Sequence, residues 1–135
     1  MLPISICSVI QVDLENAVLG HVTNVTALAV GTVVYSALFT VITSDASDGT
    51  EVPTDCYTRV ATTFCTAGAT TTGSVTNTGA VTFATCATAY TVVGWALYDK
   101  VTAGNMLYWA TVTTLAIGMG DQATFGVGAV VVTED

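Results

Sequence analysis

The stretch Tyr90-Thr-Val-Val-Gly-Trp-Ala-Leu-Tyr98 decides the fold of this chain, because it is an uncharged, mostly apolar run that a turn-forming segment follows. It is rich in β-branched and aromatic side chains, which favour a strand buried inside a sheet. Residues 32–42, which include Val33-Val-Tyr-Ser-Ala-Leu-Phe-Thr-Val41, have the same character. Two such runs in one short chain predict a β-sheet core.

Turn signals separate these runs from further strands of similar length. They are Asp48-Gly49, Ala103-Gly-Asn105 and Gly118-Met-Gly-Asp121. A series of short strands with regular turns is typical of an all-β fold, and we predict a jelly-roll-like β-sandwich. The strands are expected over residues 32–42, 57–64, 75–83, 90–98, 105–113 and 123–133.

A short N-terminal helix is expected at residues 13–22, before the first long strand. Asp13 can cap this helix, Glu15 suits its first turn and Gly20 is a candidate stop. The 135 residues suit a single hydrophobic core. We therefore predict an N-terminal arm over residues 1–12 and a single β-sandwich domain over residues 13–135.

Charge is scarce in this chain. Charged residues make up 9% of it, against about a quarter in typical soluble domains. Arg59 and Lys100 are the only Lys or Arg residues beside ten carboxylates, for a formal net charge of −8. Two cations cannot form the basic patch that nucleic-acid binding needs, so we expect no nucleic-acid partner. A surface with so few charges suits a protein whose faces are covered by neighbouring subunits.

Neither a targeting segment nor a membrane span is expected. The apolar residues 1–10 lack a basic region and a clean small-residue cleavage site. Residues 16–44 carry no formal charge apart from any on His21, but Asn24, Gly31 and several Thr interrupt the run. No Lys or Arg flanks it, so we expect no membrane partner.

Catalytic chemistry has little support. The single histidine, His21, lies at the end of the expected helix, where imidazole commonly serves only as a capping group. The sequence contains no Gly-x-Ser-x-Gly motif and no Gly-rich phosphate loop. We expect no catalytic residue, no cofactor and no enzyme activity.

Acidic residues gather in the loop that precedes Arg59. They are Asp45, Asp48, Glu51 and Asp55. This cluster is either an acidic turn that faces water or a weak calcium site, but its spacing does not fit an EF-hand, so we predict no metal site. Arg59 is expected to form an ion pair with one of these carboxylates, either at the surface or as a bridge between the loop and its strand.

Four cysteines are present, and no two of them form a Cys-x-x-Cys pair, so zinc has weak support. They are Cys7, Cys56, Cys65 and Cys86. They are either small core hydrophobes or disulfide partners. A bridge between Cys56 and Cys65 would have to span an extended strand, which is too long. Cys65 with Cys86 is the more plausible bridge within the domain, and Cys7 is the candidate for a bond to a neighbouring subunit, formed after release from a reducing cytosol.

Two tryptophans and two tyrosines lie on adjacent expected strands. They are Trp95, Tyr98, Tyr108 and Trp109. Cross-strand core packing is the default interpretation of such a group, and a sugar-binding platform is the alternative. Together with Asp48, Glu51 and Arg59, Trp95 and Trp109 are our candidates for subunit-interface or receptor contacts.

Several motifs resemble a family of small structural proteins of tailed bacteriophages. In the front half they are Tyr35-Ser-Ala-Leu-Phe-Thr40, Asp48-Gly-Thr-Glu-Val52 and Tyr57-Thr-Arg59. In the back half they are Asn77-Thr-Gly-Ala-Val-Thr-Phe83, Gly94-Trp-Ala-Leu-Tyr-Asp99, Gly104-Asn-Met-Leu-Tyr-Trp109 and Gly120-Asp-Gln-Ala-Thr-Phe125. The resemblance covers roughly residues 13–135. The four cysteines are not typical of the family, and Cys56 stands where its members often have Gly.

The resemblance implies a virion structural protein, assembled in the host cytoplasm. Members are commonly labelled tail-fibre proteins, whereas some small jelly-roll proteins of this general kind decorate capsids. Because one compact domain has no shaft and little charge, we predict a capsid decoration (cement) subunit. Its partners would be the major capsid protein and copies of itself, as a homotrimer. A tail-fibre or baseplate protein that binds a host receptor is the alternative, and a glycan-degrading enzyme is a third hypothesis.

Overall fold

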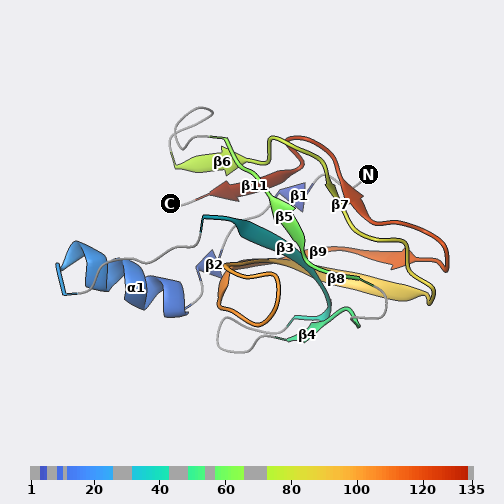
Figure 1. Ribbon diagram of the computed structural model, residues 1–135, viewed down its shortest axis with the longest axis horizontal. Helices are drawn as coiled ribbons and strands as arrows, with labels where there is room; N and C mark the ends of the chain where they lie inside the picture. Colours follow the sequence, from blue (N-terminus) through green and yellow to red (C-terminus); the bar gives the residue numbers. More distant parts are fainter. Residues whose placement is uncertain are drawn as a thin grey trace.

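The computed structural model describes residues 4–5, 9–10, 12–25, 32–42, 49–53, 57–65 and 73–133. Within these residues one short helix accompanies a set of strands (Figure 1). The elements are β1 (Ile4–Ser5), β2 (Val9–Ile10), α1 (Val12–Val22), β3 (Val34–Val41), β4 (Thr50–Glu51), β5 (Val60–Thr62), β6 (Ser74–Thr76), β7 (Val81–Thr82), β8 (Tyr90–Tyr98), β9 (Met106–Ile117), β10 (Thr124–Phe125) and β11 (Val130–Thr133). The predicted all-β class with a short N-terminal helix is confirmed.

The larger sheet is built around β8, which has the predicted bounds. Its order is β2-β9-β8-β3-β4, and β5 also pairs with β3. Both neighbours of β8 run antiparallel to it, so that Leu38 of β3 and Ala110 of β9 lie opposite Trp95. A strand with partners on both sides exposes little surface, which is why the uncharged run Tyr90–Tyr98 suits this position.

Two smaller sheets form a second layer over the larger one (Figure 1). Their orders are β1-β11-β6 and β10-β7. Two predicted strands are broken here: residues 75–83 form β6 and β7, and residues 123–133 form β10 and β11. β1 and β2, which fall in the expected N-terminal arm, pair with β11 and β9.

Asn77 explains where the second layer breaks. Its side chain is only 1% exposed, and its amide nitrogen donates to the carbonyl oxygens of Gly79 at 2.8 Å and Gly126 at 2.9 Å. Its amide oxygen accepts from the backbone N–H of Val130 at 2.8 Å. The side chain therefore satisfies backbone groups that a continuous β-ladder would otherwise pair, and it ties both broken strands together.

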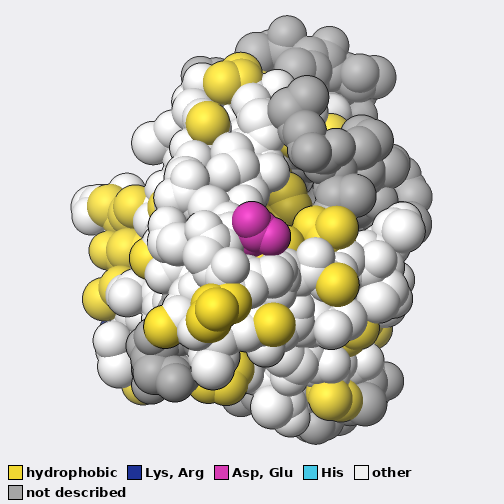
Figure 2. Space-filling model, turned by 90° about the vertical axis from the view of Figure 1, so that its right-hand side faces the viewer, with side chains coloured by type: hydrophobic (Ala, Val, Ile, Leu, Met, Phe, Trp, Pro, Cys, Tyr) yellow, Lys and Arg dark blue, Asp and Glu magenta, His cyan; other side chains and the backbone are white. Residues whose placement is uncertain are grey.

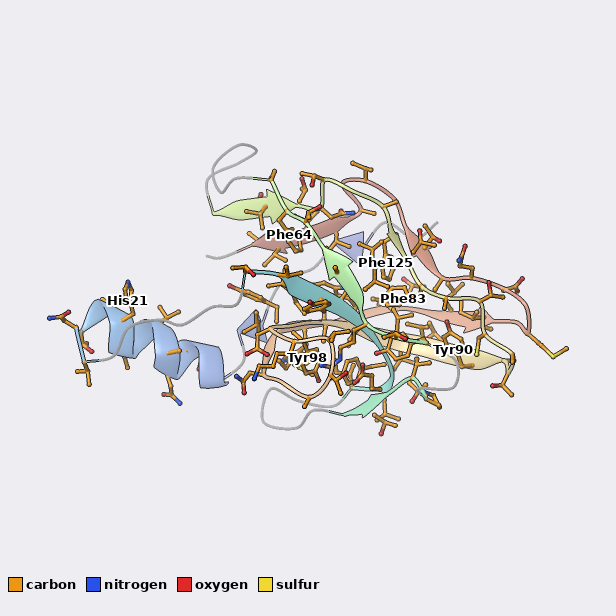
Figure 3. The ribbon with its side chains drawn as sticks, viewed as in Figure 1. His21, Phe64, Phe83, Tyr90, Tyr98 and Phe125 are labelled. Carbon is orange, nitrogen blue, oxygen red and sulfur yellow. The ribbon has the colours of Figure 1, made fainter. Side chains whose placement is uncertain are left out.

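The main hydrophobic cluster fills the space between the two layers. It includes Trp95 and Leu38 of the larger sheet, and Phe83 and Val130 of the second layer. The ring of Phe83 lies 6.0 Å from that of Phe125, edge to face, as the close approach of the labelled rings in Figure 3 illustrates. Apolar side chains from both layers thus meet in one core, as expected for a packed two-layer fold.

A second hydrophobic cluster lies on the opposite face of the larger sheet. Its members are Ala37, Phe39, Ala96, Tyr98 and Met106. Successive side chains of a strand point to opposite faces. For this reason β3 and β8 supply neighbouring residues to different clusters, such as Leu38 to the first and Phe39 to the second.

Helix α1 projects to one side of the sheets (Figure 1) and ends later than Gly20. Asn24 adopts the left-handed conformation with φ of 59°. Its N–H donates to the carbonyl oxygen of His21 at 3.1 Å, and the N–H of Val25 donates to that of Gly20 at 2.9 Å. These two bonds form a Schellman motif, so Asn24 and not Gly20 terminates the helix. No helix of the described residues is long and apolar enough to cross a membrane.

Replacing Asn77 by Ala should destabilise the fold by about 3 kcal/mol, because several buried backbone groups lose their partner at once. Urea denaturation of the two proteins measures this difference. Asn105→Ala is the matched control, since Asn105 is exposed and, within the described part of the chain, its side-chain amide donates only to Asp99. Equal stability losses in the two variants would contradict the role assigned to Asn77.

Candidate functional site

Arg59 binds three separate parts of the chain. Its Nε and Nη2 donate to the two carboxylate oxygens of Glu51, each at 2.8 Å. Its Nη1 donates to the backbone carbonyl oxygens of Lys100, at 3.0 Å, and Ala103. The guanidinium carbon lies 3.5 Å from the centroid of the Tyr98 ring, within range of a cation–π interaction. We call Glu51, Tyr57, Arg59 and Tyr98 the Arg59 clamp.

Tyr57 completes the clamp from the core side. Its hydroxyl donates to Glu51 Oε1 and accepts from the backbone N–H of Leu38 at 3.4 Å. Burial, together with the neighbouring Glu51 carboxylate, raises the pKa of Tyr57 well above its usual range. Burial alone would lower the pKa of Arg59, but its hydrogen bonds and attraction to Glu51 outweigh that effect and raise it. The Arg59 guanidinium therefore keeps its positive charge over the ordinary pH range.

The clamp fixes the hairpin at residues 99–105, which joins β8 to β9. Inside this hairpin Asp99 accepts hydrogen bonds from the backbone N–H of Asn105 at 2.7 Å and from its side-chain amide at 3.0 Å. Ala103 and Gly104 have positive φ angles of 53° and 80°. The Asp99 carboxylate and the Arg59 guanidinium, which Glu51 holds in place, thus both bind this tight connection, so the hairpin has a defined shape.

Shallow hollows surround this hairpin. One of about 410 Å³ is lined by Glu51, Tyr57, Thr58, Arg59, Val101, Thr102 and Ala103. Another of about 380 Å³ is lined by Thr32, Val33, Tyr35, Asp99, Lys100, Val101 and Thr102. Their carboxylates, Glu51 and Asp99, already accept hydrogen bonds from the protein itself.

One family model matches the chain over residues 10–133, and its description is Podophage GP4 fiber I protein gp80. The chain belongs to this fiber I family. No curated protein matches it. The match spans α1 and all elements from β3 to β11, and it confirms the resemblance to structural proteins of tailed phages. A fiber I family member is a component of the virion.

Several of the motifs that carried the resemblance meet at the clamp. Glu51 comes from the motif that ends at Val52, and Arg59 ends the short motif that begins at Tyr57. Tyr98 and Asp99 end the motif before the hairpin. The predicted ion pair of Arg59 with a loop carboxylate is present, and its partner is Glu51. Tyr57 was not predicted as a further hydrogen-bond partner of Glu51. Its position two residues before Arg59 places both side chains on one side of an extended segment.

The four aromatic residues of β8 and β9 do not form one platform. Trp95, which is 0% exposed, and Tyr108 belong to the main cluster between the layers. Tyr98 and Trp109 pack in the second cluster on the other face. Alternation along two paired strands causes this split, because Ala110 lies opposite Trp95 and Ala96 lies opposite Trp109. In this fiber I family member the four aromatic residues therefore pack in the two hydrophobic clusters, in line with the default interpretation as core packing.

The acidic loop is described only in part. Asp48, with Asp45 and Asp55, lies outside the described residues, whereas Glu51 belongs to β4 and to the clamp. Among the described residues there is no group of three or more His, Cys, Asp or Glu that could hold a metal ion. His21 is exposed in the last turn of α1.

The predicted bridge between Cys65 and Cys86 is wrong, because Cys65 is a free thiol. The two side chains have different surroundings: Cys65 Sγ accepts from the backbone N–H of Thr76 at 3.3 Å, whereas Cys86 is buried in the main cluster. The bond from Thr76 also lowers the pKa of Cys65. Cys7 and Cys56 lie outside the described residues. The bond from Cys7 to a neighbouring subunit stays a prediction.

Replacing Arg59 by Ala should destabilise the protein by about 3 kcal/mol, because it leaves the partly buried Glu51 carboxylate without its cationic partner. Lys100→Ala removes the other cation from an exposed position and should change stability by less than about 0.5 kcal/mol. Chemical denaturation of both variants measures the difference. Equal effects would show that Arg59 contributes only net charge.

Stability should fall as the pH rises above about 10, the pKa of an ordinary tyrosine. The unfolded chain then loses the Tyr57 proton while the folded chain keeps it, since the folded pKa is raised. The stabilisation that comes from the raised Tyr57 pKa is complete below that pH. Above it, this contribution declines by up to about 1.4 kcal/mol per pH unit. Urea unfolding at several alkaline pH values should show a flatter dependence for Tyr57→Phe. Parallel curves would refute the linkage.

Proposed function

We propose that this chain is a non-enzymatic structural subunit of a phage fibre, and that it works by contact with copies of itself. The family match over residues 10–133 carries this proposal, because the description of the family names a fibre protein. The fold adds support, since the charged side chains of Arg59, Glu51 and Asp99 hold the hairpin at residues 99–105 in shape.

The clamp favours a structural role over catalysis. Arg59 is one of two Lys or Arg residues in the chain, and all of its donor nitrogens bind protein oxygens. A glycan-degrading enzyme needs two free carboxylates that converge in a cleft. Of the carboxylates that line the described hollows at the hairpin, Glu51 binds Arg59 and Asp99 binds Asn105.

The fibre is preferred to the capsid shell on the strength of the family description. A decoration subunit, bound to the major capsid protein, was predicted from low charge and compact size. Both properties suit a fibre subunit equally well, because a fibre subunit and a decoration subunit both need only surfaces that neighbouring subunits cover. Copies of the same chain are the proposed partners, without nucleic acid or membrane. The homotrimer and assembly in the host cytoplasm stay predictions.

Gold-labelled antibodies against the chain, applied to purified virions and viewed by electron microscopy, locate it. We expect label at fibres, with a copy number far below that of the major capsid protein on a quantitative gel. Label spread over the whole head, at on the order of hundreds of copies per particle, would replace the fibre with the decoration role. On a non-reducing gel, a ladder of linked copies that disappears after treatment with a reductant would support the predicted bond from Cys7 to a neighbouring subunit.

A further inference from the structure

The two ends of the larger sheet differ in their chemistry. β8 and β9 run antiparallel along the long axis of the molecule (Figure 1), so the hairpin at residues 99–105 lies at one end. The turn at residues 118–121, which follows β9, lies at the opposite end. A surface feature at each end can therefore join copies of the chain in a row.

The hairpin end combines a hollow with an available cation. The hollow of about 380 Å³ is lined in part by Val33, Tyr35 and Val101, and Val33 and Val101 are 41% and 43% exposed. Lys100, which also lines it, is exposed and forms no ion pair with any carboxylate of the described residues. Arg59, by contrast, is already bound to Glu51. Lys100 is thus the positive charge that this end can offer to a partner.

The opposite end presents an apolar side chain beside a carboxylate. Met119 is 77% exposed at the tip of the turn. Asp121 is also exposed, and the bond that its Oδ2 accepts from the N–H of Gly118, at 3.2 Å, leaves Oδ1 available. Figure 2 looks onto this end: hydrophobic side chains surround a small carboxylate patch, and no Lys, Arg or His colour is visible.

We propose that the turn at residues 118–121 of one copy docks into the hairpin hollow of the next copy. Met119 would enter the hollow between Val33 and Val101, and the Asp121 carboxylate would meet the Lys100 ammonium. Charge complementarity selects a second copy as the occupant. With a net charge of −8, two copies repel each other overall, and pairing Lys100 of one copy with a carboxylate of the next offsets that repulsion at this contact. The flexible thioether of Met suits an irregular hollow.

A contact between two different surfaces of the same chain is heterologous. Repeated from copy to copy, it produces a ring if the rotation closes and an open row if it does not. Each single contact is weak, because an exposed ion pair contributes little to the free energy of association. A row of copies therefore gains stability only from the repetition of the contact. The inference deepens the proposed fibre role and rests on it for its biological meaning.

Sedimentation of the purified chain over a range of concentrations tests the contact. The wild type should form a concentration-dependent series of oligomers. Lys100→Glu and Asp121→Lys should each weaken the association constant by on the order of tenfold or more. Asp121→Asn, which keeps an oxygen for Gly118, should weaken it less. Glu15→Lys is the matched control: it changes the charge as Asp121→Lys does, at an exposed carboxylate of α1, and should leave association intact.

Mixing the two charge-reversed variants gives the sharpest outcome. Each variant alone brings like charges together at the contact. In the mixture, the acidic side chain introduced at position 100 of one variant meets the basic side chain introduced at position 121 of the other. The unchanged Lys100 of the second variant likewise meets the unchanged Asp121 of the first. Both contacts are attractive, so oligomers should reappear.

Three results would overturn the inference: a monomer at every concentration, a closed trimer that neither reversal affects, or no recovery of oligomers on mixing. None of these results bears on where the chain lies in the virion. The antibody labelling can therefore still support or reject the fibre role.

Discussion

The guanidinium of Arg59 connects β4, the segment before β5 and the β8–β9 hairpin, which are distant in the sequence and adjacent in space. Its planar fork suits the two oxygens of Glu51, and its remaining nitrogen reaches two backbone carbonyl groups. Removing such a pair from water is costly, and the cost is offset only when every donor finds an acceptor. In a chain with two Lys or Arg residues, this ion pair determines the shape of the hairpin end.

The core depends on the alternation of side chains in the central strands. β3 and β8 send Leu38 and Trp95 into the space between the layers, and Phe39 and Tyr98 to the other face. The clamp stands on this second face, where Tyr98 belongs both to the cluster and to the contact with Arg59. Core packing and the polar clamp are therefore coupled through one tyrosine, and a change in the register of β8 would disturb both.

Scarce charge suits the proposed contact between copies of this fiber I family member. A protein that meets many copies of itself needs surfaces that can be covered at little desolvation cost, and Thr, Val and Ala provide them. The carboxylates that dominate its charge oppose indiscriminate association, because copies repel one another. A lone exposed cation on such a surface then has an influence on the geometry of assembly that it would lack on a protein of mixed charge.

Local sequence patterns determined the strands at residues 32–42 and 90–98, the helix and the need of Arg59 for a carboxylate partner. Strand formation depends on β-branched and apolar side chains close together in the chain, and one cation in an acidic segment has few alternatives. Tertiary structure alone decided the breaks between β6 and β7 and between β10 and β11, the choice of Glu51 as the partner of Arg59, and the lack of a bridge between Cys65 and Cys86. Each depends on which distant segments become neighbours: a buried amide replaces ladder bonds only when another strand brings its backbone groups within reach.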